Sequence, residues 1–120
     1  MNIEQLREYC LSIKGASECL PFDDTTLVFK VMEKMFACLP LEPRNNDFNI
    51  ILKCDPERAV DLREHHSGIT PAFHFNKKYW ISIFLDSGVP DELTKELIHH
   101  SVDEVIKKLP KKKQEEYHNS

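Results

Sequence analysis

Residues 74–80 combine the side chain types that are best suited to bind a nucleic acid. Lys77 and Lys78 can neutralise phosphates, and Asn76 can donate and accept hydrogen bonds at a base or backbone edge. Trp80 offers a flat ring on which a base can stack. The alternative is a charged turn followed by a tryptophan in the core. The residues that we assign to nucleic-acid contact are His74, Asn76, Lys77, Lys78, Trp80 and, from an earlier segment, Lys30.

Alternation along residues 79–85 predicts which side of a sheet carries this tryptophan. Tyr79, Ile81, Ile83 and Leu85 form the more apolar set and are expected to face the core. Trp80, Ser82 and Phe84 would then lie on a face that no helix covers. Their expected neighbours there are Val28, Lys30, Phe36 and Lys53. An open face that is both apolar and basic would be a recognition surface, but the C-terminal helix or a partner chain could equally cover it.

The overall charge opposes a nucleic-acid partner. The 120 residues carry a formal net charge of −4 with a pI of about 5.8, which is not the balance of a globally basic protein. Only the last 14 residues are basic, because five lysines lie between Lys107 and Lys113. These lysines could extend a phosphate-binding surface, or they could complement the carbonyl end of the preceding helix.

Other common chemistries have little support in the sequence. The three glycines are far apart, which excludes a dinucleotide fingerprint and a P-loop. Four of the six histidines form two adjacent pairs, 65–66 and 99–100, whose side chains diverge on a helix, so we expect no metal. The four cysteines show no metal-binding spacing, and we expect reduced thiols and no cofactor.

Two segments could serve an enzyme, and we rank this hypothesis third. Asp23 and Asp24 could form a carboxylate pair, although adjacent carboxylates in a turn more often accept hydrogen bonds from backbone amides. Cys54 precedes Asp55 at a helix start, a position that can lower the pKa of a thiol. The same cysteine ends a strand that is expected to be buried. We therefore predict a protein that is not an enzyme.

The helices and strands that carry these residues can be predicted from the sequence. Asn2 and Gln5 can form a capping box for a first helix that stops at Gly15. Asp55 and Pro56 can start a second helix. We expect strands at 26–32, 35–39, 48–53 and 79–85, an extended piece at 73–76, and helices at 57–65 and 91–109. The order α-β-β-β-α-β-β-α predicts the α+β class, an antiparallel sheet with helices packed on one face.

One domain accounts for the whole length. Residues 1–110 form this domain, and residues 111–120 are expected to be a basic, flexible C-terminal tail. No apolar run approaches the ~20 residues of a membrane-spanning helix, so we expect no membrane contact and a cytosolic location.

Seven stretches, in order along the chain, resemble the MmcQ/YjbR family. They read PFDDTTLVFKV at 21–31, KMFA at 34–37, LKCDPE at 52–57, GITP at 68–71, HFNKKYW at 74–80, LD at 85–86 and PDE at 90–92. Each stretch alone is weak evidence, but seven stretches in this order are hard to obtain by accident. The resemblance extends over roughly residues 1–110. The resemblance implies a CyaY-like (frataxin-like) fold, also described as a double wing, with a suggested role in DNA binding and no established activity or cofactor.

One departure limits what this resemblance implies. Frataxin relatives bind iron through a dense acidic ridge, whereas the first helix here interleaves Glu4 and Glu8 with Arg7. Hard cations need several converging oxygens, so an iron role is not carried over.

Two functions therefore remain open. The first is weakly sequence-specific DNA binding. The second is a protein- or small-ligand-binding module that uses the open sheet face. In either case we expect a monomer or a weak homodimer.

Overall fold

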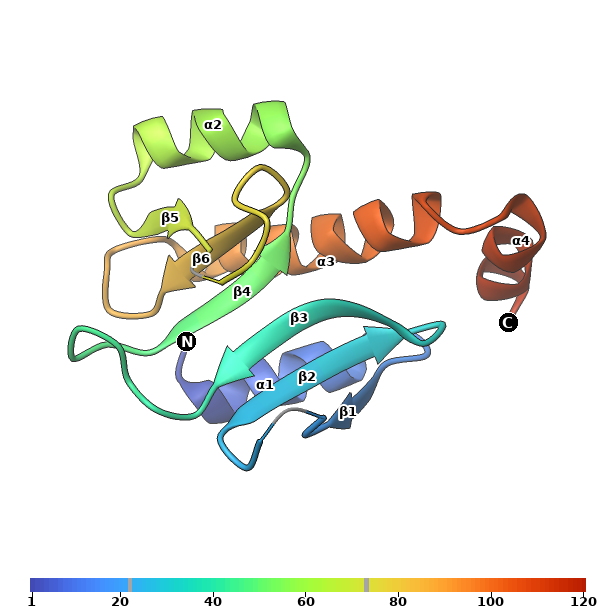
Figure 1. Ribbon diagram of the computed structural model, residues 1–120, viewed down its shortest axis with the longest axis horizontal. Helices are drawn as coiled ribbons and strands as arrows, with labels where there is room; N and C mark the ends of the chain where they lie inside the picture. Colours follow the sequence, from blue (N-terminus) through green and yellow to red (C-terminus); the bar gives the residue numbers. More distant parts are fainter. Residues whose placement is uncertain (22, 73) are drawn as a thin grey trace.

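The computed structural model describes residues 1–21, 23–72 and 74–120 (Figure 1). In chain order, the described elements are α1 (Ile3–Ser12), β1 (Ser17–Cys19), β2 (Thr26–Val31), β3 (Lys34–Pro40), β4 (Asn49–Lys53), α2 (Pro56–His65), β5 (Ile69–Pro71), β6 (Trp80–Phe84), α3 (Asp91–Lys107) and α4 (Lys111–Asn119). The helix caps follow the sequence: Asn2 and Gln5 form the predicted capping box, and Asp55 accepts a hydrogen bond from the Arg58 amide at 3.1 Å.

The six strands form one antiparallel sheet in the order β1-β2-β3-β4-β6-β5. The apolar faces of α1, α2 and α3 contribute to a single core on one side of this sheet. The predicted α+β class, with helices on one face, is therefore confirmed. Among the described residues, no helix is long and apolar enough to cross a bilayer.

The predicted element order misses two elements. Strand β1 is only three residues long, too short for a periodicity signal, and Arg7 of α1 holds it by donating to Glu18 at 2.7 Å. Of residues 111–120, the expected flexible tail, Lys111–Asn119 form helix α4. The reason is Tyr117, whose hydroxyl donates to the Lys14 carbonyl at 2.8 Å and whose ring lies against Lys14 and Gly15.

Two loop predictions also change. The link between β2 and β3 is Met32–Glu33 rather than residues 33–34, and both residues have positive φ (50° and 66°), as a tight two-residue hairpin requires. The expected extended piece at 73–76 is wrong for residues 74–76, which belong to no strand, and its residue 73 lies outside the described residues. The neighbouring strand is instead β5.

A β-bulge changes which side of the sheet Phe36 occupies. Phe29 pairs with Ala37 and Lys30 pairs with Met35, so Phe36 is the extra residue in β3. Phe36 is fully buried in the helix-covered core, where its ring centroid lies 6.4 Å from that of Phe29. The expectation that Phe36 lies on the open face is wrong, because the bulge interrupts strict alternation.

Ser101 of α3 joins β3 to β4 beyond this bulge. The pairing of the two strands is short: Ala37 lies opposite Leu52, and Cys38 lies opposite Ile51. The Ser101 hydroxyl donates to the Phe36 carbonyl at 2.5 Å and accepts from the Lys53 amide at 2.9 Å, and the residue is fully buried. One side chain thus satisfies a buried backbone group on each strand.

Substituting Ser101 with alanine should therefore be costly. Ser101→Ala leaves the Phe36 carbonyl and the Lys53 amide without their partner, and we expect a loss of about 2–4 kcal/mol in the free energy of unfolding. Urea unfolding measures this loss. Ser12→Ala is the control, because the Ser12 hydroxyl bonds to Tyr9 at the surface. An equal, small effect of both variants would contradict the role of Ser101.

The docking of α4 gives a second prediction. Tyr117→Ala removes the ring contact and the hydrogen bond to Lys14, and we expect a loss of about 1–2 kcal/mol. Tyr117→Phe keeps the ring and should lose less than half of that amount. Thermal unfolding of both variants measures the difference. If residues 111–120 were a flexible tail, neither variant would change the melting temperature.

Candidate functional site

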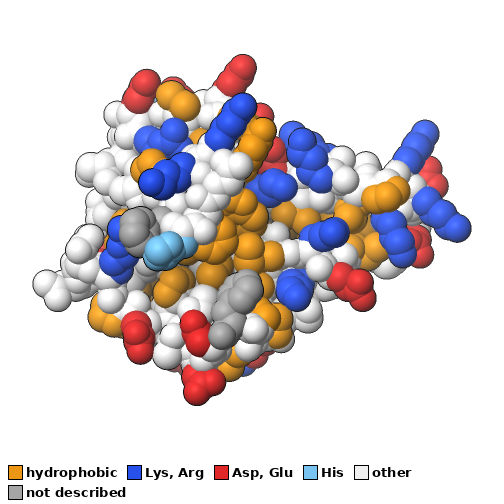
Figure 2. All heavy atoms as spheres, in the orientation of Figure 1, with side chains coloured by type: hydrophobic (Ala, Val, Ile, Leu, Met, Phe, Trp, Pro, Cys, Tyr) orange, Lys and Arg blue, Asp and Glu red, His pale blue; other side chains and the backbone are white. Residues whose placement is uncertain are grey.

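The face of the sheet opposite the core carries a continuous row of residues. Strand registers align one residue from each of the six strands: Cys19, Val28, Cys38, Ile51, Ser82 and Thr70. Val28, Cys38 and Ile51 are buried and form a second, smaller apolar cluster with Ala72. In Figure 2, hydrophobic side chains cross the middle of this face, and Lys and Arg side chains border them.

The predicted division of β6 between the two faces is confirmed. Ile81 and Ile83 belong to the helix-covered core, whereas Trp80 packs against the smaller cluster on the open face. Trp80 is half-buried, with its ring centroid 5.3 Å from that of Phe75. It is therefore neither a fully exposed platform nor a member of the main core.

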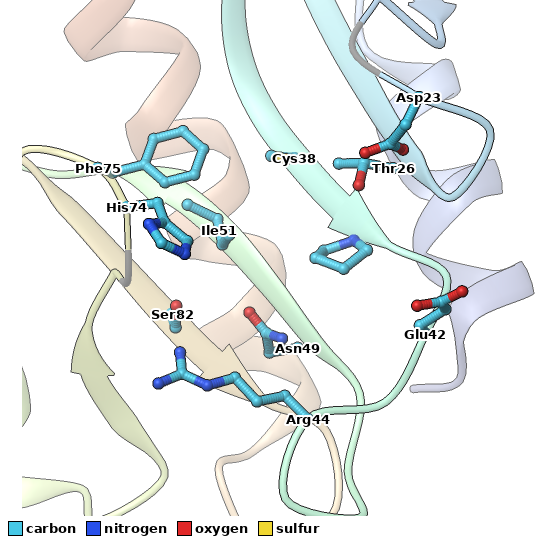
Figure 3. A pocket seen from close by; sticks show the side chains of 11 residues that line it. Asp23, Thr26, Cys38, Glu42, Arg44, Asn49, Ile51, His74, Phe75 and Ser82 are labelled. Carbon is cyan, nitrogen blue, oxygen red and sulfur yellow. The ribbon is translucent and has the colours of Figure 1, made fainter.

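A cavity of about 550 Å³ lies on the open face next to this aromatic pair. Ile51 and Cys38 supply apolar lining from the sheet (Figure 3). His74 and Phe75 line it from the loop that leads into β6. The volume falls within the range of about 300–1,000 Å³ that is typical of small-molecule sites.

Two buried polar side chains line the cavity. Asn49 of β4 is 4% exposed and Ser82 of β6 is 1% exposed. The Ser82 hydroxyl oxygen has no hydrogen-bond partner among the described residues. A buried hydroxyl without a partner is uncommon and destabilising, so a ligand that bonds to it would remove a cost of the empty state.

Charged residues of both signs lie around the cavity. Arg44 comes from the β3–β4 loop, where its backbone pairs with Asp47, and its side chain extends toward Ser82 (Figure 3). Asp23 and Glu42 lie on the other side. The pKa of Asp23 is lowered because the backbone amide of Thr25 donates to its carboxylate at 2.8 Å, so this group is anionic near neutral pH.

The structure separates the predicted site residues into two groups. His74 lines the cavity. Asn76 caps a turn by accepting from the Lys78 amide at 3.0 Å, which engages the acceptor of the side chain that we expect to meet a base or backbone edge. Lys77 and Lys78 are exposed in the same loop, immediately before Trp80.

Trp80 lies at a second hollow, which is lined by several lysines. This hollow has a volume of about 340 Å³ and is lined in part by Lys34, Lys53 and Lys108. Lys53 is the cross-strand partner of Trp80. Lys30 pairs with Met35, which also lines the hollow. We refer to Trp80, Lys34, Lys53 and Lys108 as the lysine–tryptophan cluster.

Part of both groups could not be predicted from the sequence. Lys34 follows a hairpin turn and Lys108 lies in a basic segment near the C-terminus, and no sequence spacing connects either residue with Trp80. The polar lining of the cavity had one weak signal, a serine that interrupts the apolar strand sequence WISIF. No spacing rule could connect it with Asn49 and Arg44.

The thiol and histidine groups are in ordinary structural environments. Burial raises the pKa of Cys54 to about 11, which keeps this thiol protonated near neutral pH. The Asp55 amide, which follows Cys54 in the chain, donates a hydrogen bond to Nε2 of His100 at 3.2 Å, and burial lowers the pKa of this histidine. Across residues 1–21, 23–72 and 74–120, no three His, Cys, Asp or Glu side chains gather as a metal site would require.

These environments predict the reactivity of the four free cysteines. Burial raises the pKa of Cys10 to about 12 and those of Cys38 and Cys54 to about 11, whereas Cys19 is partly exposed. With Ellman's reagent at pH 8, we expect one thiol to react quickly in the folded protein and all four after unfolding. Rapid reaction of Cys38 would contradict this prediction, because it would show that the reagent reaches a buried thiol of the cavity lining.

Comparison with known proteins places this geometry in one family. The YjbR family model matches residues 11–103. The uncharacterised protein YjbR of Escherichia coli K12 is 32% identical over 113 residues, covering 94% of each chain. The uncharacterised protein YbdF of Escherichia coli O157:H7 is also 32% identical, covering 92% of this chain and 89% of its own.

Two solved structures share the fold. The crystal structure of a Deinococcus radiodurans protein with a DUF419 domain has a TM-score of 0.87 and 38% identity, covering 98% of this chain and 88% of its own. The crystal structure of a Pseudomonas syringae protein has a TM-score of 0.75 and 27% identity, covering 88% of this chain and 99% of its own.

Proposed function

This chain belongs to the YjbR family, and we propose that it is a non-enzymatic binding protein that contacts DNA through the open face of its sheet. The observation that carries this proposal is the lysine–tryptophan cluster. Three cationic side chains line one hollow with an aromatic ring, and this combination suits phosphates and a stacked base. Contacts of this kind read the backbone, so we propose weak sequence specificity.

Further lysines extend the same surface. Lys30 neighbours Met35 of the hollow, and Lys77 and Lys78 lie in the loop that leads into Trp80. His74 and Asn76 belong to the same loop, with Asn76 acting through the shape of the turn as well as through its amide. The proposed contact set therefore keeps His74, Asn76, Lys77, Lys78, Trp80 and Lys30 and adds Lys34, Lys53 and Lys108.

The distribution of acidic residues reconciles this proposal with a net charge of −4. Half of the 20 acidic residues belong to α1, α2 and α3, which pack on the opposite side of the sheet. A local basic surface can bind phosphates while the whole chain is acidic, because salt screens charges beyond about 10 Å at 0.1 M.

The proposal also includes the fold classification of the protein, its location and its oligomeric state. A six-stranded antiparallel sheet with helices on one face supports a CyaY-like, or double-wing, classification. Four free cysteines support a reducing, cytosolic location. The protonated Cys54 thiol and the turn-forming role of Asp23 support the absence of an enzymatic site. We propose a monomer or weak homodimer.

A small ligand on the same face is the second candidate function. The specific observation is the cavity beside the lysine–tryptophan cluster, in which the Ser82 hydroxyl is buried and finds no hydrogen-bond partner among residues 1–21, 23–72 and 74–120. An unsatisfied polar atom in a concave site favours a small polar molecule over a flat protein surface.

DNA binding predicts a steep dependence on salt. We expect fluorescence anisotropy of labelled single- and double-stranded DNA to show binding at 50 mM salt that weakens by tenfold or more at 200 mM. Lys34→Gln and Lys108→Gln should each weaken binding roughly fivefold and reduce the salt slope by about one. Trp80→Ala should weaken single-strand binding more than duplex binding.

Lys95→Gln is the matched control, because Lys95 is a lysine of α3, where its ammonium lies near Glu92 and Tyr9. This variant should bind DNA like the unchanged protein. Absence of binding at 50 mM salt, or an equal loss in all three lysine variants, would contradict the proposal.

A further inference from the structure

We infer that the cavity lined by Asn49, Ser82 and Phe75 binds a single nucleobase that carries an exocyclic amino group, with adenine the best match. The base could come from an unpaired position in a DNA strand or from a free nucleoside. In the first case the inference rests on the DNA function proposed above; in the second it does not.

The Ser82 hydroxyl supplies the first contact. Its oxygen is buried without a hydrogen-bond partner in the described part of the chain, and its cross-strand neighbours are Ile51 on one side and Thr70 on the other. The Thr70 hydroxyl donates its hydrogen bond to the Pro71 carbonyl at 3.3 Å. Ser82 is thus left to a molecule in the cavity, to which it can either donate or accept.

Asn49 supplies a second contact, in which the donor and the acceptor of its side chain fix the orientation of the ligand. Its carboxamide carries a donor and an acceptor side by side, and Figure 3 shows it between Ile51 and Arg44 on the cavity lining. The edge of adenine presents an acceptor next to an amino donor, and an asparagine pairs with both. An amino-bearing base therefore matches the polar part of the cavity.

The apolar walls suit a flat ring. Phe75 faces the cavity beside Ile51 and Cys38, and the Cys38 thiol stays neutral because burial raises its pKa to about 11. A heterocycle in this position would lie against carbon and sulfur atoms while its edge reaches Asn49. The cavity of about 550 Å³ has room for a nucleoside.

The surrounding charges select against a densely charged ligand. Asp23 is anionic and Glu42 lies near it, so a triphosphate would meet repulsion on that side. Carboxylates instead accept hydrogen bonds from amino and sugar hydroxyl groups. Arg44, on the opposite side, can take a single phosphate.

The aromatic pair connects the cavity to the lysine–tryptophan cluster. Phe75 lines the cavity and contacts Trp80, which lines the hollow with Lys34, Lys53 and Lys108. A strand whose backbone follows the lysines can therefore place one base on each side of this pair. The cavity and the lysine–tryptophan cluster, which the sequence does not connect, thus form one continuous binding surface for a single strand.

The test uses the full chain, adenosine and two 12-nucleotide single strands, oligo(dA) and oligo(dT). Isothermal titration and amide chemical-shift mapping measure binding to the unchanged protein, to Ser82→Ala and to Asn49→Leu. Ser82→Ala removes a hydroxyl that has no partner among the residues that the structure describes, so the melting temperature should stay equal or rise. Thr70→Val is the control, since Thr70 is the neighbour of Ser82 in the same row.

We expect adenosine to shift the amides of Asn49, Ile51 and Ser82, and Ser82→Ala to weaken its binding at least fivefold. Thr70→Val should change it less than twofold. Oligo(dA) should bind more tightly than oligo(dT), and Ser82→Ala should remove that preference. Oligo(dA) preference lost in Ser82→Ala without detectable adenosine binding also supports the inference, in its strand-bound form. Ser82→Ala remains decisive if Asn49→Leu fails to fold.

Failure of this inference is distinguishable from failure of the DNA function. Strand binding that depends on Lys34 and Lys108, with no adenosine binding and no effect of Ser82→Ala, overturns the nucleobase site and leaves the DNA function standing. Adenosine binding that depends on Ser82, with no strand binding at 50 mM salt, supports the site and overturns the DNA function.

Discussion

The hydroxyl of Ser101 is the contact on which the rest of the architecture depends. It bonds to β3 at Phe36 and to β4 at Lys53, next to the end of the direct pairing between these strands at Ala37 and Leu52. Because Ser101 belongs to α3, the same contact sets the position of the longest helix against the centre of the sheet. The helix covers one face there and leaves the opposite face to its own apolar row.

The two faces of the sheet consequently have different physical roles. The helix-covered face is a continuous core of fully buried side chains, including Phe29, Phe36 and Leu52. The open face buries only a narrow cluster around Cys38 and Ile51, with a cavity at one end and lysines at the other. Stability resides mainly in the first face, so the second can hold a buried polar group such as the Ser82 hydroxyl, which has no hydrogen-bond partner among the described residues.

Sequence patterns anticipate the parts of this arrangement that depend on neighbours along the chain. The capping box at Asn2, the cap at Asp55 and the alternation that separates Trp80 from Ile81 are short-range features, and each is present. The same patterns fail at Phe36, where one extra residue reverses the alternation, and at residues 111–120, where Tyr117 orders a helix through a contact with Lys14.

By itself, the sequence determined the α+β class, the helix caps and the likeness to one family, because these follow from local hydrogen bonding, side chain periodicity and residue identity. Only the tertiary structure decided which residues meet on the open face. Lys34, Lys53 and Lys108 approach Trp80 from three elements, and Asn49 and Ser82 lie in separate strands. Such convergence depends on strand order and on one bulge, and both are set by long-range packing that no local pattern encodes.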